Sequence, residues 1–225
     1  MNKLKSDDVF SPGAGNRIHK LDNKFFNRPN VVLIARELLG KILVTCFEKK
    51  ITSGRIVETE AYAGIEDRAS HAYGGRRTNR TEIMYKQAGT SYIYLCYGIH
   101  HLFNIVTNKE NIPHAILVRA LEPLTGIETM LARTRKKSLD FSLTRGPGNL
   151  SKAMGLSTVH TGKSLFDGDI YVGEDGYRPS AKDIVTTARV GVDYAGPDAV
   201  LPYRFYLEGN GYVSAPLKKD NPTIK

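Results

Sequence analysis

The stretch at residues 54–64 reads Gly-Arg-Ile-Val-Glu-Thr-Glu-Ala-Tyr-Ala-Gly and decides the fold that we predict. Its apolar and β-branched residues, with a glycine at each end, are typical of a strand bounded by turns. Side chains two apart on a strand share a face about 7 Å apart, so Glu60 would lie beside Tyr62. An acid beside an aromatic ring suits chemistry on a flat ring. The alternative is a solvated strand face, where Glu and Tyr are both tolerated.

The composition indicates one basic globular domain. A chain of 225 residues can bury a full core, and a hydrophobic fraction of 41% with a mean hydropathy of −0.31 suits a globular protein. The 32 Lys and Arg residues against 23 Asp and Glu residues give a formal net charge of +9. This charge is typical of a protein that meets a polyanion, and nucleic acid, an anionic membrane surface and an acidic protein all fit.

Several protein classes lack support in the sequence. Residues 1–10 hold no apolar h-region and no apolar run approaches about 18 residues, so we expect neither a secretory signal nor a membrane span. Cys46 and Cys96 form no CxxC pair and lie in apolar runs. They are therefore expected to be buried free thiols in a reducing compartment, which predicts a cytoplasmic location.

Motifs for metal, cofactor and nucleophilic chemistry are also missing. There is no HExxH, and the adjacent His100 and His101 would face opposite sides of a strand, so no metal site is expected. Neither GxxxxGK[ST] nor GxGxxG occurs, and we predict no bound ATP, NAD or other cofactor. The GxSxG elbow of serine hydrolases is absent, and burial of both cysteines would argue against a thiol nucleophile.

The order of patterns predicts a polar, flexible leader at residues 1–21 and a single domain at 22–225, without a linker or repeat. The expected elements of this domain are a short helix capped by Asn30, a strand at 41–48, a turn at 49–54, a strand at 114–122, a helix at 126–137, a Gly/Pro turn entering a short helix at 144–155, and edge elements at 203–207 and Val213. The region after residue 157 carries no chemistry that the sequence identifies.

Residues 67–86 form an irregular basic segment around Gly74 and Gly75. Backbone amides and guanidinium groups in such a loop can hold phosphates, although an ordinary solvated loop is the favoured interpretation of this segment alone. A lone histidine here, His71, is typically a hydrogen-bonding bystander. The basic residues of the segment are Arg68, Arg76, Arg77, Arg80 and Lys86.

Residues 91–96 and 102–106 predict two strands joined in a hairpin around Gly98. Tyrosines within an antiparallel pair, here Tyr92 and Tyr94, usually pack in the core or across strands. Tyr97 would stand at the tip of the hairpin, where packing does not explain it. In a basic protein, such a ring can serve as a wedge or a stacking surface for bases.

Taken together, these residues make the chain resemble the alkyladenine (3-methyladenine) DNA glycosylase family. The resemblance covers roughly residues 24–215. No single motif is decisive, but the motifs occur in the same order as in the family, and this order makes the resemblance specific. The segments that carry it are Phe26-Asn-Arg-Pro, Ala35-Arg-Glu-Leu-Leu-Gly-Lys, Val57-Glu-Thr-Glu-Ala-Tyr, Glu66-Asp67 through His71, Gly74-Gly75-Arg76, Tyr92-Ile-Tyr-Leu-Cys-Tyr-Gly, Asn104-Ile, Arg119-Ala-Leu-Glu-Pro-Leu, Gly146-Pro147 and Ala188-Arg-Val-Gly-Val.

The resemblance implies an α+β fold: a single mixed domain with a curved antiparallel β-sheet core, peripheral helices and a protruding β-hairpin that intercalates in the DNA minor groove. It implies catalytic roles for Glu60, as general base for the attacking water, and for Arg119, which would hold that water. Tyr62, His71 and Tyr94 would enclose the flipped base.

The resemblance also implies the contacts with DNA. Asn104 would lie against the purine and discriminate against normal guanine, and Tyr97 would fill the gap left in the base stack. The segment from Arg145 to Lys152 would contact the DNA backbone, together with Arg76 and Arg77 of the basic loop. The residues after Tyr97 match the family least closely.

The implied activity is that of a monofunctional DNA glycosylase, a hydrolase that starts base excision repair without a cofactor. It would flip 3-methyladenine, 7-methylguanine, hypoxanthine or ethenoadenine out of duplex DNA and hydrolyse the N-glycosidic bond. The expected partner is double-stranded DNA with damaged purines, no membrane contact is expected, and the protein would be a cytoplasmic, nucleoid-associated monomer. Two alternatives remain open at this point: a non-catalytic nucleic-acid-binding module and a structural, partner-binding basic protein.

Overall fold

The computed structural model describes residues 17–216, and its longest strand is β3 (Lys50–Tyr62). The prediction of a strand after Gly54 is confirmed, but the strand begins four residues before Gly54. The turn into it is formed by Glu48 and Lys49, both with positive φ, and follows β2 (Ile42–Phe47). Gly54 lies inside the strand, where a Cβ atom would stand 2.9 Å from Leu121 Cβ. This glycine therefore marks a close approach of two strands rather than a turn.

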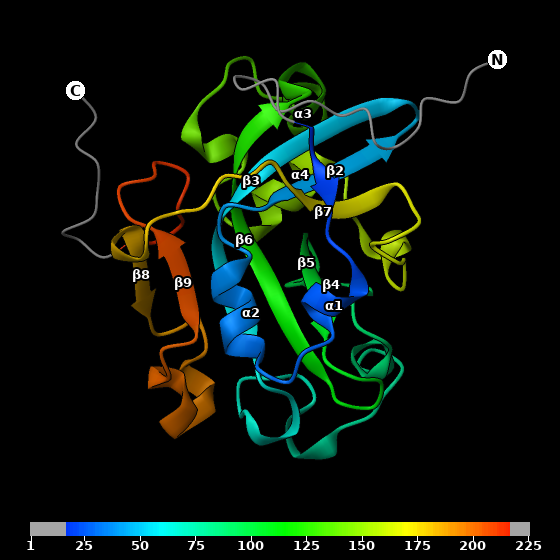
Figure 1. The fold of residues 1–225 in the computed structure, drawn as a ribbon, viewed down its shortest axis with the longest axis vertical. Coiled ribbons are helices and arrows are strands. Elements are labelled where there is room, and N and C mark those ends of the chain that lie inside the picture. The colour runs from blue at the N-terminus through cyan, green and yellow to red at the C-terminus, as the bar shows by residue number, and fades with distance from the viewer. Residues whose placement is uncertain (1–16, 217–225) are drawn as a thin grey trace.

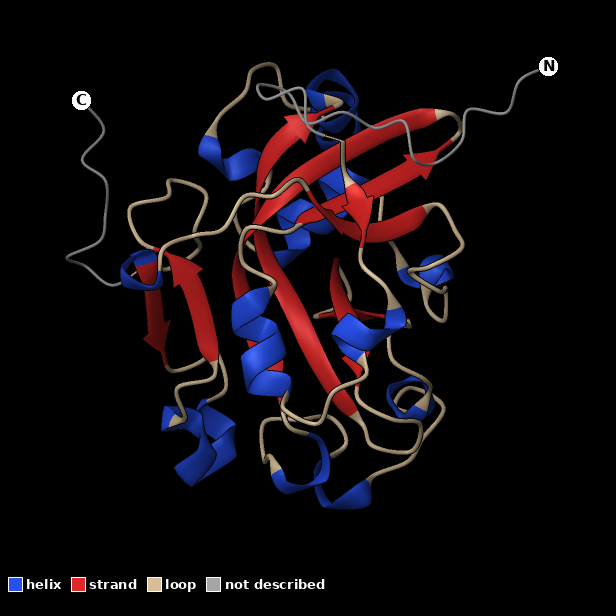
Figure 2. Ribbon diagram, in the orientation of Figure 1, coloured by secondary structure: helices blue, strands red, loops and turns tan. Residues whose placement is uncertain are grey.

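The described strands form one antiparallel sheet in the order β1-β7-β2-β3-β6-β5-β4 (Figures 1 and 2). Strand β3 pairs with β6 along one side, and with β2 and then β9 along the other, so it is the central strand of the domain. The remaining strands are β1 (His19–Lys20), β4 (Ser91–Cys96), β5 (His100–Thr107), β6 (His114–Thr125), β7 (Ile170–Glu174), β8 (Ile184–Thr187) and β9 (Arg204–Leu207).

Short helices lie around this sheet, so the chain is a single domain of the α+β class. Asn30 caps α2 as predicted, because its side chain accepts a hydrogen bond from the backbone N–H of Leu33 at 2.9 Å. The helices are α1 (Asn23–Phe26), α2 (Val31–Glu37), α3 (Ile127–Thr134) and α4 (Pro147–Met154), with short 3₁₀ turns between the strands.

The two faces of β3 have different neighbours. The Thr59 hydroxyl donates to the carbonyl oxygen of Ala35 in α2 at 2.8 Å, so α2 covers the face that carries Thr59. Since side chains alternate along a strand, Glu58 and Glu60 point to the opposite face. Both carboxylates are fully buried there, which rules out the solvated strand face considered from the sequence.

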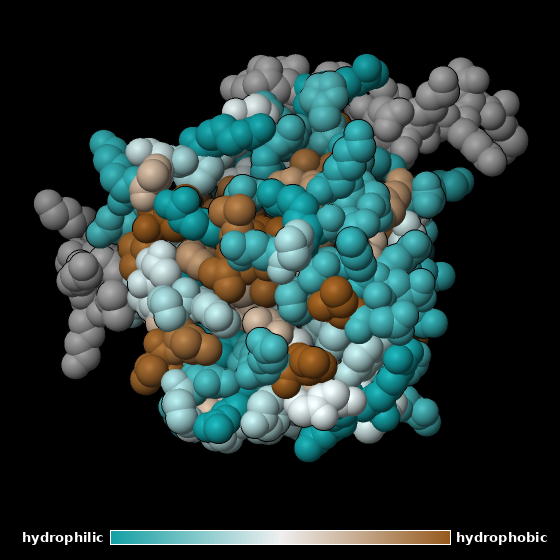
Figure 3. All heavy atoms as spheres, turned by 60° about the horizontal axis from the view of Figure 1, so that its bottom comes forward, coloured by the Kyte–Doolittle hydropathy of each residue, from teal (hydrophilic) through white to brown (hydrophobic). Residues whose placement is uncertain are grey.

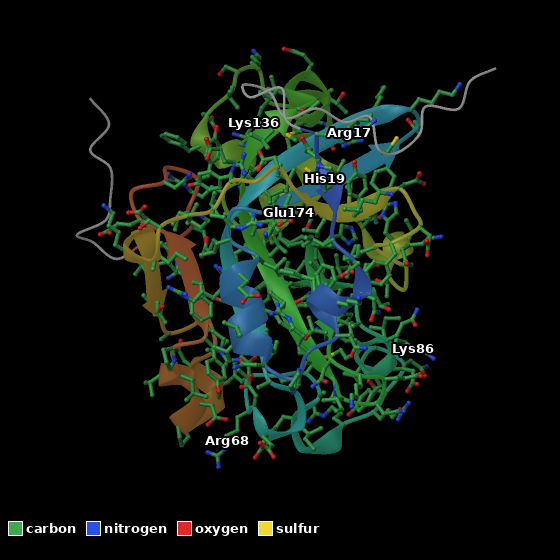
Figure 4. The ribbon with its side chains drawn as sticks, in the orientation of Figure 1. Arg17, His19, Arg68, Lys86, Lys136 and Glu174 are labelled. Atoms are coloured by element: carbon green, nitrogen blue, oxygen red, sulfur yellow. The ribbon has the colours of Figure 1, made fainter. Side chains whose placement is uncertain are left out.

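The expected leader at residues 1–21 falls largely outside the described residues, which begin at Arg17. Within 17–21, Ile18 and Leu21 are buried, and the short β1 pairs with β7. Figure 4 shows His19 of β1 close to Glu174, its partner across this pair. This part of the segment therefore belongs to the sheet.

The surface carries scattered basic and apolar side chains. In Figure 4, the basic residue Arg68 lies at one end of the molecule and Lys136 lies near the other. At the end that Figure 3 brings forward, hydrophobic side chains lie among hydrophilic ones.

Cys46 and Cys96 are partly exposed and unpaired, so the expectation that both are buried is wrong. Within residues 17–216, no helix has the length and apolar character needed to cross a bilayer.

Candidate active site

A row of side chains crosses four neighbouring strands on the sheet face that carries Glu60. The register pairs Glu60 of β3 with Leu117 of β6, Leu117 with Asn104 of β5, and Asn104 with Tyr92 of β4. Directly opposite residues in a sheet share a face, so these four side chains form one continuous line. Two adjoining cavities, of about 830 and 30 Å³, lie against this part of the sheet.

The larger cavity gathers most of the side chains selected from the sequence. Its lining includes Tyr62, His71, Tyr94, Tyr97 and Arg119, which come from β3, β4, β6 and the loops between strands. The smaller cavity shares Tyr62, His71 and Tyr94 and adds Asn104. The fold therefore brings together residues as far apart in the chain as Tyr62 and Arg119.

Glu60 lies behind the cavity wall with each carboxylate oxygen held by a protein group. Oε1 accepts from the backbone N–H of Val190 at 2.8 Å and lies 3.2 Å from Arg119 Nη1. Oε2 accepts from the Tyr62 hydroxyl at 2.8 Å. A carboxylate oxygen can accept about two hydrogen bonds, so Oε2 retains capacity for one more donor.

Arg119 stands at an irregularity of strand β6. Ala120 pairs with Glu58 and Val118 with Thr59, so Arg119 is left without a partner residue in the β3 register. Such bulges redirect a side chain and are frequent beside active sites. Burial alone would lower the pKa of Arg119, but the charges of Glu60 and Glu58 outweigh it and raise the pKa. The guanidinium is therefore a fixed positive charge beside Glu60.

Aromatic rings form the wall of both cavities. The His71 and Tyr94 rings meet edge to face with centroids 4.7 Å apart, and Tyr92 packs against Tyr94. Burial, followed by the negative charge of Glu60, raises the pKa of Tyr62 well above its usual value. Tyr62 therefore keeps its proton and remains the donor to Glu60. These rings are a surface suited to a planar ligand.

His71 is held in one defined tautomer. Arg80 Nη2 lies 3.2 Å from His71 Nε2, and because a guanidinium can only donate, Nε2 must accept. Nδ1 then carries the proton and donates to the Tyr92 hydroxyl at 2.8 Å. Burial, reinforced by the charges of Arg80 and Arg76, lowers the pKa of His71 to about 4. The ring is accordingly neutral at physiological pH, and it lines both cavities.

This shift predicts a loss of stability in mild acid. Between pH 6.5 and about 4, the unfolded chain binds a proton at His71 that the folded chain excludes, so the free energy of unfolding falls as the pH falls. Relative to a His71→Asn variant, wild type should lose at most about 1.4 kcal/mol per pH unit in this window. Urea unfolding of both proteins from pH 4 to 8 measures this; parallel pH dependences would contradict it.

Comparison with the variant is needed because other histidines behave similarly. Burial also lowers the pKa values of His114 and His160, and both remain in the variant. Their contribution cancels in the difference between the two proteins, which isolates His71.

The predicted hairpin is formed by β4 and β5, which pair from Ser91 and Ile105 to Cys96 and His100. Its three-residue turn holds Tyr97, with φ of 51°, and Gly98, with φ of 73°. The Tyr97 side chain is 91% exposed and that of Ile99 is 71% exposed. Two large apolar side chains in water at a turn have no packing role in the isolated domain.

The start of α4 lies against the base of this hairpin. A Cβ atom at Gly148 would stand 2.7 Å from His100 Nδ1, so any larger residue would have to displace the His100 side chain. Residues 146–149, which are the N-cap and the first turn of α4, also line the large cavity. The predicted Gly/Pro turn is thus part of the same surface as the hairpin.

The basic residues selected from the sequence are only partly brought together. Arg76 and Arg145 line the large cavity, whereas Arg77 and Lys152 line neither cavity. Arg77 pairs with Glu82 at 2.7 Å, and Arg145 Nε donates to the Gly211 carbonyl oxygen at 3.0 Å. Arg80, which the sequence placed only in the loop, lies 4.8 Å from the Tyr94 ring centroid.

The region after residue 157, in which the sequence identified no chemistry, contributes contacts to Glu60 and Tyr62 and side chains to both cavities. Besides the Val190 N–H on Glu60, Arg189 Nη2 donates to Asp67 at 2.8 Å and its guanidinium lies 4.9 Å from the Tyr62 ring. Tyr194 lines both cavities. In the sequence, the only indication that this region belongs to the site was the segment Ala188-Arg-Val-Gly-Val, which is part of the family resemblance.

Among the described residues, no group of three or more His, Cys, Asp or Glu is arranged to hold a metal ion.

Comparison with known proteins identifies the relatives of this chain. The sequence model of the family described as Methylpurine-DNA glycosylase (MPG) matches residues 24–211. A protein of Desulfitobacterium hafniense named "Putative 3-methyladenine DNA glycosylase" is 46% identical over 202 residues, which cover 87% of this chain and 98% of the relative. Proteins with the same name from Clostridium acetobutylicum and Bdellovibrio bacteriovorus are 44% identical over 208 residues and 45% identical over 187 residues. The matches cover 89% and 82% of this chain and 100% and 94% of those relatives.

Proposed function

Since the chain belongs to the methylpurine-DNA glycosylase family, and is therefore a DNA glycosylase, we propose that it removes alkylated and deaminated purines by a water-dependent reaction at Glu60. The expected substrates are 3-methyladenine, 7-methylguanine, hypoxanthine and ethenoadenine in double-stranded DNA. The observation that carries this proposal is the buried carboxylate of Glu60, which is held by Arg119, Tyr62 and the Val190 N–H at the wall of an aromatic cavity.

Glu60 is suited to act as the general base. Its Oε2 can accept a hydrogen bond from a water molecule, remove a proton as that water attacks C1′ of the sugar, and so complete cleavage of the N-glycosidic bond. The same negative charge stabilises the positive charge that develops on the sugar as the base departs. Arg119 would contact the water and would fix Glu60 through the 3.2 Å ion pair. A cationic 3- or 7-alkylated purine leaves without a protein acid.

The aromatic wall supplies a site for the flipped base. A purine inside a duplex is out of reach and must rotate out of the stack at a cost of a few kcal/mol. Tyr62, Tyr94 and His71 would enclose it, and Asn104 would lie at its edge. The smaller cavity, at about 30 Å³, has the volume of about one water molecule, so the base would occupy the larger cavity or separate these rings.

The hairpin tip and the basic loops would hold the duplex. Tyr97 would enter the gap left by the flipped nucleotide, in the minor groove, and offset part of the cost of unstacking. Arg76, Arg77, Arg145 and Lys152 would contact phosphates, which carry no sequence information but position the duplex. A non-catalytic binding module would need the rings and the basic residues, but it would have no use for a buried acid held by Arg119.

Release of free base from defined duplexes tests the proposal. Separate duplexes carry one hypoxanthine, ethenoadenine or 7-methylguanine, and the products are analysed without alkali and again after it. We expect free base in both cases and strand breaks only after alkali, because hydrolysis leaves an abasic site with an intact strand. Tight binding without free base from any lesion would contradict the proposal and favour a binding module.

A further inference from the structure

A second acid, Glu58, lies beside Glu60 on the same face of β3 and is fully buried. Its Oε1 accepts from Arg119 Nε and from Arg204 Nε, each at 2.8 Å, and from the Ser214 hydroxyl at 3.0 Å. Its Oε2 accepts from the Ser214 backbone N–H at 2.7 Å. These donors surround the carboxylate and bind it to residues 61 to 156 positions away in the chain.

The contacts of Glu58 determine where the Arg119 guanidinium points. Arg119 Nε is held by Glu58, and Nη2 donates to the Ser214 hydroxyl at 3.1 Å. A guanidinium is planar and rigid, so fixing two of its nitrogens fixes the third. That third nitrogen, Nη1, is the one that lies 3.2 Å from Glu60 Oε1.

We propose that Glu58, together with Ser214, is a positioning residue for base release, which holds Arg119 so that a single nitrogen faces Glu60. Without this restraint, Arg119 could present two nitrogens to Glu60 and occupy both of its oxygens, including Oε2, which the attacking water needs. The proposal rests on the proposed role of Glu60 as general base.

The C-terminal part of the described chain takes part in this arrangement. Arg204 on β9 contacts Glu58 and also donates through Nη2 to the carbonyl oxygens of Ser214 and Ala215. Glu58 therefore accepts from two arginines, of which only Arg119 reaches Glu60. Segment 204–215 is thus connected to the reaction centre through Glu58, although it does not line the cavity.

Single-turnover base release by a Glu58→Gln variant tests this role. We expect the rate constant to fall about 10-fold, since small misplacements of catalytic groups are costly. The amplitude of the reaction and the affinity for lesion duplex should stay at the wild-type level. A role in folding alone would have the opposite signature, because it lowers the fraction of active molecules, and hence the amplitude, at an unchanged rate constant.

Ser214 gives a second test that leaves the buried charges paired. Ser214→Ala removes one hydroxyl and should slow the rate constant about 3-fold, and Ser214→Thr, which keeps the hydroxyl, should restore it. If Glu58→Gln does not fold, this pair decides the matter. Asp175→Asn is the matched control, since Asp175 pairs with Arg55 of the same strand at 2.8 Å, outside the large cavity. It should lower the melting temperature without changing the rate constant.

The results separate this inference from the proposed function. A wild-type rate constant in both Glu58→Gln and Ser214→Ala, with Glu60→Gln inactive, would overturn the positioning role and leave Glu60 as base. Base release that persists in Glu60→Gln would instead overturn the proposed function itself. A rate constant lowered equally in Ser214→Ala and Ser214→Thr would also contradict a role for the hydroxyl.

Discussion

Glu60→Gln should lower the single-turnover rate constant for base release by about three orders of magnitude, because general acid–base catalysis contributes about 10²- to 10⁴-fold. The variant keeps the shape of the side chain and an oxygen for the Val190 N–H, but it can neither remove a proton from water nor supply a full negative charge to the sugar. Binding to a lesion duplex should persist, since the aromatic wall and the hairpin are unchanged. Quenched single-turnover assays and a binding titration measure the two effects separately.

Glu122→Gln is the matched control for this variant. Glu122 lies on the neighbouring strand β6, accepts from Asn210 Nδ2 at 3.0 Å, and does not line the large cavity. Glu122→Gln makes the same chemical change as Glu60→Gln, the loss of one carboxylate, and base release should remain at the wild-type rate. A rate constant for base release by Glu60→Gln within tenfold of the wild-type rate constant would rule out Glu60 as the general base.

Tyr97→Ala should slow base release about 30-fold without changing the stability of the protein. The side chain is 91% exposed at the hairpin turn and contributes little to folding. In the complex it would replace stacking energy that the flipped base gives up, and a loss of about 2 kcal/mol corresponds to about 30-fold in rate. The measurement is the single-turnover rate constant on a hypoxanthine duplex, with the melting temperature of the free protein recorded alongside.

Val159→Ala serves as the comparison for Tyr97→Ala. Val159 is another exposed apolar residue, at 76%, in the 3₁₀ turn Thr158–His160, and it lines neither the large nor the small cavity. Truncating it should leave base release unchanged. Equal rates for Tyr97→Ala, Val159→Ala and wild type would exclude Tyr97 as the wedge.

Local patterns in the sequence predicted the elements of the site. The alternation of side chains in β3 placed Glu60 beside Tyr62, and the two are hydrogen-bonded at 2.8 Å. The position of Gly98 predicted a hairpin with Tyr97 in its turn, and β4 and β5 pair accordingly. Strand and turn preferences act over a few residues, so a single sequence is sufficient to reveal them.

Other features depended on contacts that no local pattern encodes. Gly54 looked like the end of a strand, whereas it allows β3 to approach Leu121 of β6. The role of Glu58 follows from Arg204 and Ser214, which stand about 150 positions away in a region that appeared to carry no chemistry. The partners of a buried charge are set by tertiary packing, and the sequence gives only the residue types.

Borohydride trapping during turnover is the most direct test of a reaction that uses water and no protein nucleophile. Wild-type protein is mixed with a hypoxanthine duplex in the presence of sodium borohydride, and both free base and protein–DNA adducts are measured. A water held by Glu60 attacks the sugar without bonding the protein to DNA, so we predict full release of free base and no adduct. A borohydride-dependent covalent adduct in proportion to the base released would contradict this mechanism, because it requires an amine of the protein as the nucleophile.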